Sequence, residues 1–412
     1  MVRAGRIAAL LLLAGVLAAG PGAPIARAAP PDDTAALRAE QQALESGDGL
    51  SSRAQRVLFQ ARTRQDDGNH GEAAAALEEW LAGDPGRDHH LLRFTLAVSQ
   101  LALDRPADAA ANLERAVALA PRYGRAWLRL GEADYATGNF ARAGEAFAQA
   151  YDLSPGREPE LLYYAGASLL AAGRAADATD TLARLVASHP DRPEFAWYQA
   201  LIAAAVDADQ PARAEKALAD LIRAHPNDPA VWDLAYRFHA GQADYEQAAV
   251  HLAVAGRLRD LSRDELEQLG DLYAVIGVPL EAARAYERAF AAGAEPAPEA
   301  YRKLASAWLA AHESEAARAT LDRALTARPT PKLWALKGDL EYRAGDYDAA
   351  DAAYAAALAL DDAFGRGHLM RGYCAYERDR RAEARAHLER AAEFPDQARS
   401  ARSLLARLDE AP

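Results

Sequence analysis

The apolar positions of the chain follow a pattern that repeats every 33 to 36 residues, from about Ala54 to the C-terminus. Each period holds two apolar stripes at helical spacing, with a short polar turn between them. In the third period the stripe residues are, in chain order, Trp127, Leu130, Gly131, Ala143, Phe147 and Ala150. A period of this length predicts helix pairs that stack into a solenoid.

Small residues set the register of the repeats. Two helix axes approach to about 8–10 Å only where small residues lie at the crossing, which predicts Gly131 and Ala143 as a crossing pair. Glycines in the turns at residues 137–139, 172–174 and 344–346 suit the left-handed conformation that ends a helix. Aligning the small residues gives ten units, which start near Ala54, His90, Gly124, Pro159, Phe195, Pro229, Arg263, Pro298, Pro331 and Gly365.

The middle of the array departs from this pattern. Ile202 and Tyr236 replace the small crossing residue in the fifth and sixth units, and Asp260 stands where a proline is expected. A solenoid is held together only by contacts between neighbouring repeats. We therefore predict a bend or local looseness near residues 200–262.

The order of an aromatic residue, Leu, Gly, Ala, Phe, Ala and Pro resembles the tetratricopeptide repeat (TPR) family. The third unit carries these residues as Trp127, Leu130, Gly131, Ala143, Phe147, Ala150 and Pro155. The resemblance covers residues 54–396 and implies an all-α fold, a right-handed superhelical solenoid of about ten helix pairs. Residues 397–412 continue as one amphipathic helix, which is expected to cap the last apolar face.

The first residues have the order of a secretory signal peptide. Arg3 and Arg6 precede an apolar run at residues 7–19, and a small-x-small site follows at residues 26–28. We expect residues 1–28 to be removed by cleavage near Ala28. The run is shorter than the roughly 20 residues that span a membrane, and no cysteine follows it to carry a lipid. The mature chain is expected to be periplasmic, without a direct membrane span, and to begin with a linker and short helix over residues 29–53.

Charge and cysteine usage narrow the classes of partner. The chain has 60 acidic and 47 basic residues, interspersed, and a formal net charge of −13. Phosphate backbones bind to clustered positive charge, so nucleic acid is not expected as a partner. Cys374 is the sole cysteine and cannot form a disulfide within the chain. Its place in a helix predicts a small buried hydrophobe.

Catalytic and metal signatures are absent from the sequence. There is no Gly-Xaa-Ser-Xaa-Gly elbow, no phosphate-binding glycine loop and no His-Glu-Xaa-Xaa-His helix. His89 and His90 are the only adjacent histidines, and a metal would need further ligands at site spacing. We expect neither an enzyme nor a cofactor or metal site.

Proteins that this sequence resembles bind ligands in a concave groove, mainly through the second, fifth, ninth and twelfth positions of each first helix. In the second to fourth units these positions give an apolar lining of Leu91, Phe94, Val98, Leu101, Leu128, Tyr135, Tyr163 and Leu170. The seventh unit gives an acidic stripe of Asp264, Glu267 and Asp271. The last two units give an aromatic patch with mixed charge, formed by Asp339, Tyr342, Arg366, Leu369, Tyr373 and Tyr376. Two alternatives are open: tight winding buries much of the apolar lining, and the acidic stripe is an ordinary solvated face.

An apolar groove of this kind suits a peptide or an amphipathic helix from a protein partner. The leading hypothesis is a periplasmic scaffold or adaptor in an envelope complex. The segment from residue 361 to the cap resembles the TPR proteins that accompany TonB, ExbB and ExbD, which implies a link to outer-membrane transport. The alternative is an assembly or export factor for a cell-envelope polysaccharide. A polymer would need aromatic side chains exposed along the groove, whereas a protein partner would need apolar pockets between them.

Overall fold

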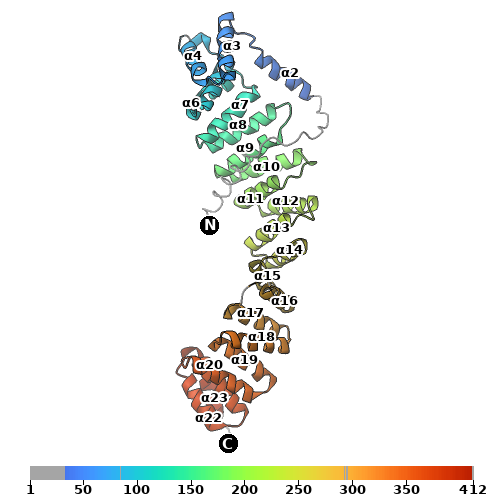
Figure 1. The fold of residues 1–412 in the computed structure, drawn as a ribbon, viewed down its shortest axis with the longest axis vertical. Helices are drawn as coiled ribbons and strands as arrows, with labels where there is room; N and C mark the ends of the chain where they lie inside the picture. The colour runs from blue at the N-terminus through green and yellow to red at the C-terminus, as the bar shows by residue number, and fades with distance from the viewer. Residues whose placement is uncertain (1–32, 84, 292, 294–295, 411–412) are drawn as a thin grey trace. The chain divides into compact units, whose positions relative to one another are not determined.

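The computed structural model describes residues 33–410 except 84, 292 and 294–295, so the predicted signal peptide lies outside the described residues. Within the described part the chain forms 22 α-helices, one short 3-10 helix (η1, Pro85–Arg87) and no strand. Figure 1 shows the helices following one another as hairpins along the chain. The fold is therefore all-α, as the repeat pattern predicts.

The described helices between residues 52 and 391 form ten pairs. The first helices are α3 (Ser52–Asp66), α5 (His90–Ala102), α7 (Gly124–Ala136), α9 (Pro159–Ala171), α11 (Phe195–Asp207), α13 (Pro229–Gly241), α15 (Arg263–Val275), α17 (Pro298–Ala310), α19 (Pro331–Ala344) and α21 (Gly365–Glu377). The second helices are α4 (His70–Ala82), α6 (Pro106–Leu119), α8 (Phe140–Leu153), α10 (Ala175–Ser188), α12 (Pro211–Ala224), α14 (Tyr245–Leu258), α16 (Pro279–Ala291), α18 (Ser314–Ala327), α20 (Tyr347–Leu360) and α22 (Arg381–Ala391). Nine of the ten predicted starts coincide with the first residue of a first helix, and α3 begins two residues before Ala54.

The chain divides into two compact units, unit 1 (Met1–Pro226) and unit 2 (Asn227–Pro412). Each unit holds five repeats. The boundary falls inside residues 200–262, where the sequence predicts irregular packing. All four helices of the fifth and sixth repeats are formed, and the bend itself stays a prediction.

Glycine at the helix crossing makes room for a large side chain of the second helix. A Cβ on Gly131 would lie 2.8 Å from Phe147 Cδ1, and one on Gly338 would lie 2.7 Å from Tyr354 Cε1. Contacts this short are not tolerated, so only glycine lets the ring pack against the first helix. The side chain nearest to Gly131 belongs to Phe147, and the predicted crossing of Gly131 with Ala143 stays a prediction.

The turn between the two helices of a repeat contains one left-handed residue, fourteen positions after the start of the repeat. Gly138, Gly173 and Gly345 have φ values of +79°, +76° and +80°, which confirms the predicted helix ends. Five repeats place another residue type there, with φ between 55° and 63°: Asp104, Asp209, Ala243, His312 and Asp379. The turn geometry is thus kept where the glycine is absent from the sequence.

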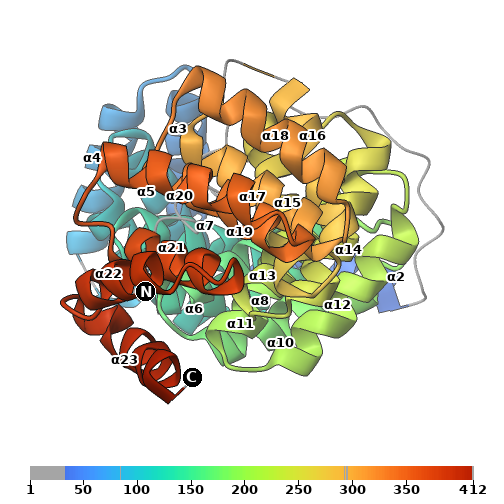
Figure 2. The same ribbon diagram turned by 90° about the horizontal axis from the view of Figure 1, so that it is seen from below.

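A last helix, α23 (Pro395–Glu410), covers the end of unit 2 as predicted. It lies beside α22 and also contacts α21 (Figure 2). Its stripe of Ala401, Leu404 and Leu408 is buried against Leu388 and other residues of these helices. The apolar face of the tenth repeat is therefore shielded from water.

Candidate partner-binding groove

Three residues of the predicted apolar lining lie in the core of unit 1. Leu91 is fully buried, and Phe94 and Tyr163 are buried as well. Leu91 lies under the turn that precedes α3, where a Cβ on Gly47 would be 3.8 Å from Leu91 Cδ1. Phe94 packs edge-on against Tyr123, with ring centroids 5.2 Å apart. These three residues are therefore buried and do not line an open groove, because neighbouring segments of the chain cover them.

The other members of the apolar lining are partly exposed. Val98 and Leu101 border the core cluster of the first repeats. Leu128 and Tyr135 border the cluster around Phe147, and Leu170 is half-buried too. These side chains offer apolar surface next to a packed core, and their role in binding stays a prediction.

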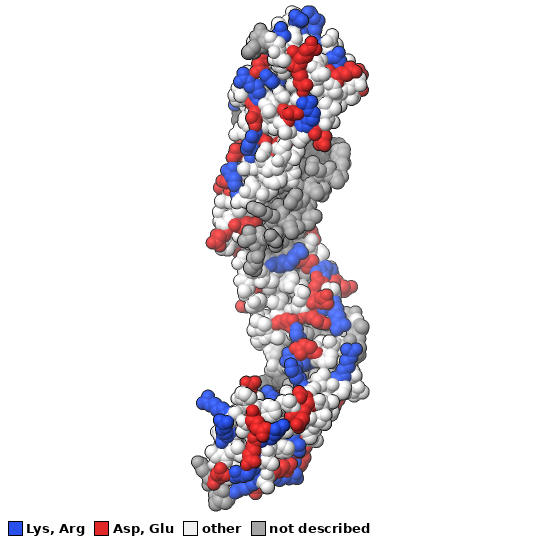
Figure 3. Space-filling model, turned by 90° about the vertical axis from the view of Figure 1, so that its left-hand side faces the viewer, with Lys and Arg blue, Asp and Glu red and all other residues white. Residues whose placement is uncertain are grey.

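Neighbouring cations neutralise most of the acidic stripe. Arg263 Nε donates to Glu267 at 2.9 Å, and Lys303 Nζ lies 2.7 and 2.8 Å from the two carboxylate oxygens of Asp271. Asp264 is exposed. On the face that Figure 3 shows, basic and acidic side chains lie interspersed. The stripe is therefore a paired surface and not a free negative one.

Two aspartates of unit 2 are held by tyrosines of the second helices. Tyr286 Oη donates to Asp271 and Tyr354 Oη donates to Asp339, each at 2.6 Å. Burial raises the pKa of both tyrosines well above the usual range, and the hydrogen bond to the carboxylate raises it further. The hydroxyls therefore stay protonated and fix the aspartates at the surface of the first helices. Arg366 Nη2 donates to Asp339 from the next repeat, at 2.7 Å.

A cavity of about 370 Å³ lies across the first helices α17 and α19 and the start of α21, and we name it the unit 2 groove. It is lined by Glu299, Arg302, Ser306, Lys332, Ala335, Leu336, Asp339, Phe364 and Arg366. All but Leu336 and Phe364 occupy second, fifth or ninth positions of first helices. Of these residues, only Asp339 and Arg366 were predicted from the sequence. Applying the same positions to the eighth repeat would have found Glu299, Arg302 and Ser306.

The unit 2 groove carries more positive than negative charge. Arg302 Nε donates to Glu299 at 2.9 Å, and this hydrogen bond lowers the pKa of Glu299. Arg366 is paired with Asp339. Lys332 is exposed, and among the described side chains none forms an ion pair or hydrogen bond with it. One cation of the groove is thus available to a ligand.

The tyrosines of the aromatic patch are half-buried. Tyr342 packs edge-on against Tyr347, with centroids 5.2 Å apart, and burial raises the pKa of Tyr342 to about 12. Arg407 of α23 lies 5.5 Å over the ring of Tyr376. Tyr373 packs with Tyr376 against the C-terminal core cluster. The capping helix therefore covers part of the patch.

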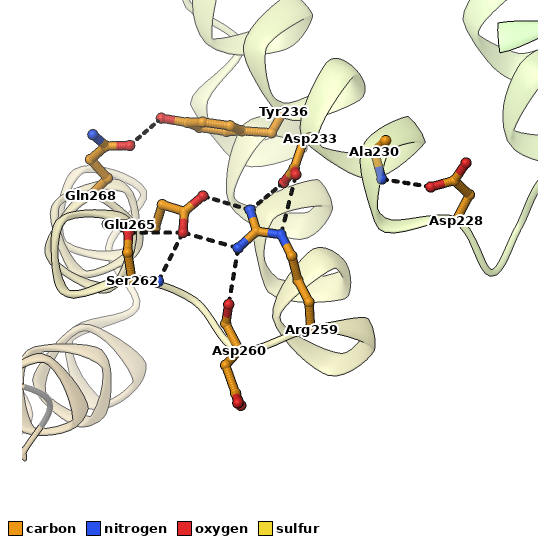
Figure 4. Close-up of polar contacts among 9 residues, drawn as sticks. All are labelled: Asp228, Ala230, Asp233, Tyr236, Arg259, Asp260, Ser262, Glu265 and Gln268. Atoms are coloured by element: carbon orange, nitrogen blue, oxygen red, sulfur yellow. Dashed lines mark hydrogen bonds and ion pairs between the residues drawn. The ribbon is translucent and has the colours of Figure 1, made fainter.

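The connection between α14 and α15 is held by one arginine, which Figure 4 shows. Arg259 Nη2 donates to Asp233 of α13 at 2.6 Å, and Nη1 donates to Glu265 of α15 at 3.0 Å and to the Asp260 carbonyl at 3.1 Å. Ser262 and Glu265 also form a capping box at the start of α15. The place where the expected proline is missing is therefore tied by ion pairs.

Cys374 is fully buried, and burial raises the pKa of its thiol to about 12. A thiol in this state is a poor nucleophile, which agrees with its predicted packing role. In the part of the chain that the structure describes, no three His, Cys, Asp or Glu side chains come together as a metal site. None of the described helices is long and apolar enough to cross a bilayer.

Stacked helix pairs with a first-helix groove define an α-solenoid repeat protein. A tetratricopeptide repeat family model matches residues 94–158, 268–330 and 336–398, and a second tetratricopeptide repeat model matches residues 135–204. These matches cover more than half of the chain. The chain belongs to the tetratricopeptide repeat family.

Several solved structures are similar to this chain at low sequence identity. A structure of Naa15/Naa10 bound to HypK-THB is 16% identical over 87% of this chain, with a TM-score of 0.50. This chain spans 66% of that chain's length. MamA is 23% identical over 38% of this chain and 91% of that chain, with a TM-score of 0.34. YrrB, described as a TPR protein with an unusual peptide-binding site, is 19% identical over 46% of this chain and 97% of that chain, with a TM-score of 0.36. A search of curated proteins finds no match.

Membership of the family sets the class of function. Tetratricopeptide repeats form scaffolds for protein–protein interaction and are typically non-catalytic. The candidate binding surfaces are therefore those whose side chains are exposed to a partner protein.

Proposed function

We propose that the chain is a scaffold that binds an acidic segment of a partner protein in the unit 2 groove. The observation that carries this proposal is Lys332 at the second position of α19, an exposed cation near Glu299 that forms no hydrogen bond or close ion pair with the described residues. A ligand carboxylate beside Lys332 would form a charge-assisted hydrogen bond that the described residues do not supply. The partly exposed apolar side chains of Leu336 and Phe364 supply contact area next to the charge.

The size of the groove limits what it accepts. A volume of about 370 Å³ holds a few side chains and not a folded domain. The lining residues come from three successive repeats, so a ligand would contact them in series. An extended peptide or one face of a helix meets both requirements.

The proposed location is the periplasm, after removal of residues 1–28. This rests on the charged start, the apolar run and the small-x-small site of the sequence. A complex that accompanies TonB, ExbB and ExbD is the proposed setting, on the resemblance of the C-terminal repeats. Osmotic-shock fractionation and N-terminal sequencing test the location. A mature protein that starts near Ala29 in the shock fluid supports it, and a cytoplasmic protein that keeps Met1 contradicts it.

Binding of a polysaccharide is the alternative function. Sugar rings stack on exposed aromatic faces, yet Tyr342 pairs with Tyr347 and Tyr376 is covered by Arg407. The aromatic patch thus has little free ring surface. This observation favours a protein partner.

A charge reversal tests the proposed groove. The full chain is crosslinked in envelope extract, and the crosslinked partner peptides are identified by mass spectrometry. Lys332→Glu is expected to lower recovery of the partner about tenfold, because loss and reversal of one charge in a contact costs about 1–2 kcal/mol. Lys216→Glu is the matched control, since Lys216 is an exposed lysine of α12 outside the groove.

The outcomes separate the alternatives. A partner whose acidic segment crosslinks near α17 or α19, and whose recovery falls only with Lys332→Glu, supports the proposal. Equal recovery with both variants would place the partner elsewhere. Recovery of glycan without protein would favour the polysaccharide function.

A further inference from the structure

Helix α7 begins without a cap from its own segment. Its N-cap residue Tyr123 makes no side-chain hydrogen bond to the helix. Gln41 of helix α2 (Asp33–Glu45) takes this place: its Oε1 accepts from the Gly124 N–H at 2.9 Å, and its Nε2 donates to the Arg122 carbonyl at 2.7 Å. A first-turn N–H without such a contact donates its hydrogen bond to water or to a ligand. Helix α2 therefore supplies the capping group of α7 from elsewhere in the chain.

Charge adds to this contact. Glu40 of α2 forms an ion pair with Arg122, and Glu45 forms one with Arg125 at 3.0 Å. Both carboxylates lie beside the start of α7, the positive end of its dipole. The acidic side of α2 thus matches a basic surface at the start of the third repeat.

The histidine pair singled out in the sequence joins the same surface. His90 Nε2 lies 2.8 Å from the carbonyl oxygen of Leu44 in the last turn of α2. His89 Nδ1 accepts the Leu91 N–H at 3.2 Å and caps α5. The pair has a docking and capping role here, which explains two adjacent histidines without a metal.

Helix α2 is held weakly. Thr34 is buried and Leu44 borders the core, but no other described side chain up to residue 45 is buried. The side chains of Arg122 and Arg125 remain 62% and 59% exposed. Exposed ion pairs contribute little to stability. The link to α3 holds Gly47 and Gly49, with φ of +76° and +90°. Release of α2 would therefore break few buried contacts of its own, although it would expose Tyr123 beneath it.

End capping does not account for the position of α2. The first repeat leaves Phe59 of α3 72% exposed, while α2 contacts the second and third repeats. Under the contact lies Tyr123, which is fully buried and whose hydroxyl has no hydrogen-bond partner among the described residues. The surface therefore contains a polar group, the Tyr123 hydroxyl, that forms no hydrogen bond with α2.

We infer that the surface formed by His90, Arg122, Gly124 and Arg125 is a docking site for an acidic amphipathic helix. Helix α2 occupies it in cis, and a partner helix displaces α2. The partner helix presents a glutamate, a glutamine next to it, a leucine three residues later and a second glutamate beside that leucine, as residues 40, 41, 44 and 45 do in α2. This site belongs to unit 1 and does not depend on the unit 2 groove.

The test uses the full chain and a fluorescein-labelled peptide of residues 33–50. Glu40→Arg with Glu45→Arg releases α2 and frees the surface. Adding Arg122→Glu and Arg125→Glu restores the ion pairs with reversed sign. Fluorescence anisotropy measures binding of the peptide, and hydrogen exchange of residues 33–45 measures release of α2.

The double variant is expected to bind the native peptide at least tenfold more tightly than the wild type, with faster exchange in α2. The quadruple variant is expected to regain slow exchange and to lose peptide binding, because its basic surface is gone. Equal peptide binding to all three proteins would overturn the inference, as would faster exchange in the double variant without peptide binding. Circular dichroism checks folding, and Gln41→Ala is a milder variant that removes only the amide contact.

Discussion

At the scale of single residues, the turn between the two helices of a repeat requires a residue with positive φ, and this holds for residues other than glycine as well. Glycine meets this demand at Gly138 and Gly345 without strain. Ala243 meets it at φ +58° in the sixth repeat, where its Cβ approaches the following carbonyl. For residues other than glycine this conformation costs about 1–2 kcal/mol. Local strain is therefore stored at the turn between α13 and α14.

Ala243→Gly is expected to stabilise the protein. Relief of the left-handed strain exceeds the added freedom of glycine in the unfolded chain, so the free energy of unfolding should rise by about 0.5–1 kcal/mol. Urea unfolding followed by circular dichroism measures it.

Gly345→Ala is the matched control for this prediction. Nothing lies within 4 Å of a Cβ at this position, so only the backbone conformation at φ +80° is changed. It should lower the free energy of unfolding by about 1 kcal/mol. If both substitutions shifted stability in the same direction, the strain argument would fail.

At the scale of elements, Arg259 joins α13, the end of α14 and the start of α15 where the repeat pattern is weakest. Its guanidinium group contacts Asp233 and Glu265, and the hydrogen bond from Arg259 lowers the pKa of Glu265 to about 2. A carboxyl with a depressed pKa stabilises the fold above its unfolded pKa of about 4.3, and this contribution is lost as the pH falls towards 2.

Glu265→Gln should therefore change the pH dependence of stability. Gln keeps the capping box with Ser262 and removes only the charge. At pH 7 the variant should be less stable by about 1–2 kcal/mol, a value reduced for solvent screening of a side chain that is 29% exposed. The difference from wild type should shrink between pH 4.5 and 2, by about the same amount.

The control for Glu265→Gln is a substitution in an ion pair that is expected to contribute little to the free energy of unfolding. Glu315, whose side chain is 87% exposed, pairs with Arg318 on one helix face. Glu315→Gln should leave the unfolding curve unchanged at every pH. A difference between wild type and Glu265→Gln that stayed constant from pH 7 to pH 2 would contradict the ion-pair account.

At the scale of the whole molecule, stability is divided between two compact units of five repeats. Repeat proteins are stabilised by contacts between neighbouring repeats, so a local defect spreads only as far as those contacts reach. Unit 1 contains the core cluster around Leu113, and unit 2 contains the core cluster around Leu321.

Gly131→Trp should unfold part of unit 1 and spare unit 2. The new side chain collides with Phe147, because even a Cβ would lie 2.8 Å from that ring. Hydrogen exchange in mild denaturant should show lost protection within residues 33–226 and native protection within residues 227–410. Gly338→Trp, against Tyr354, should give the reverse pattern. Loss of protection in both units with either substitution would show that the chain unfolds as one body.

The repeat pattern by itself predicted the helix pairs, their starts and the capping helix. This succeeded because small residues at crossings, left-handed turns and apolar stripes are local requirements that recur in every repeat. The pattern also pointed to the first-helix positions that line the unit 2 groove, although Arg302 and Lys332 were not selected from it.

Tertiary structure decided which of these positions remain accessible. Leu91 is covered by the turn after α2, and Asp271 is paired with Lys303 from the next repeat. Both contacts join residues that are more than thirty positions apart in the chain. Burial and charge pairing depend on what packs against a residue from elsewhere in the chain, and a local pattern does not contain that information. The sequence alone thus determined the scaffold, while packing determined which of its surfaces a partner can reach.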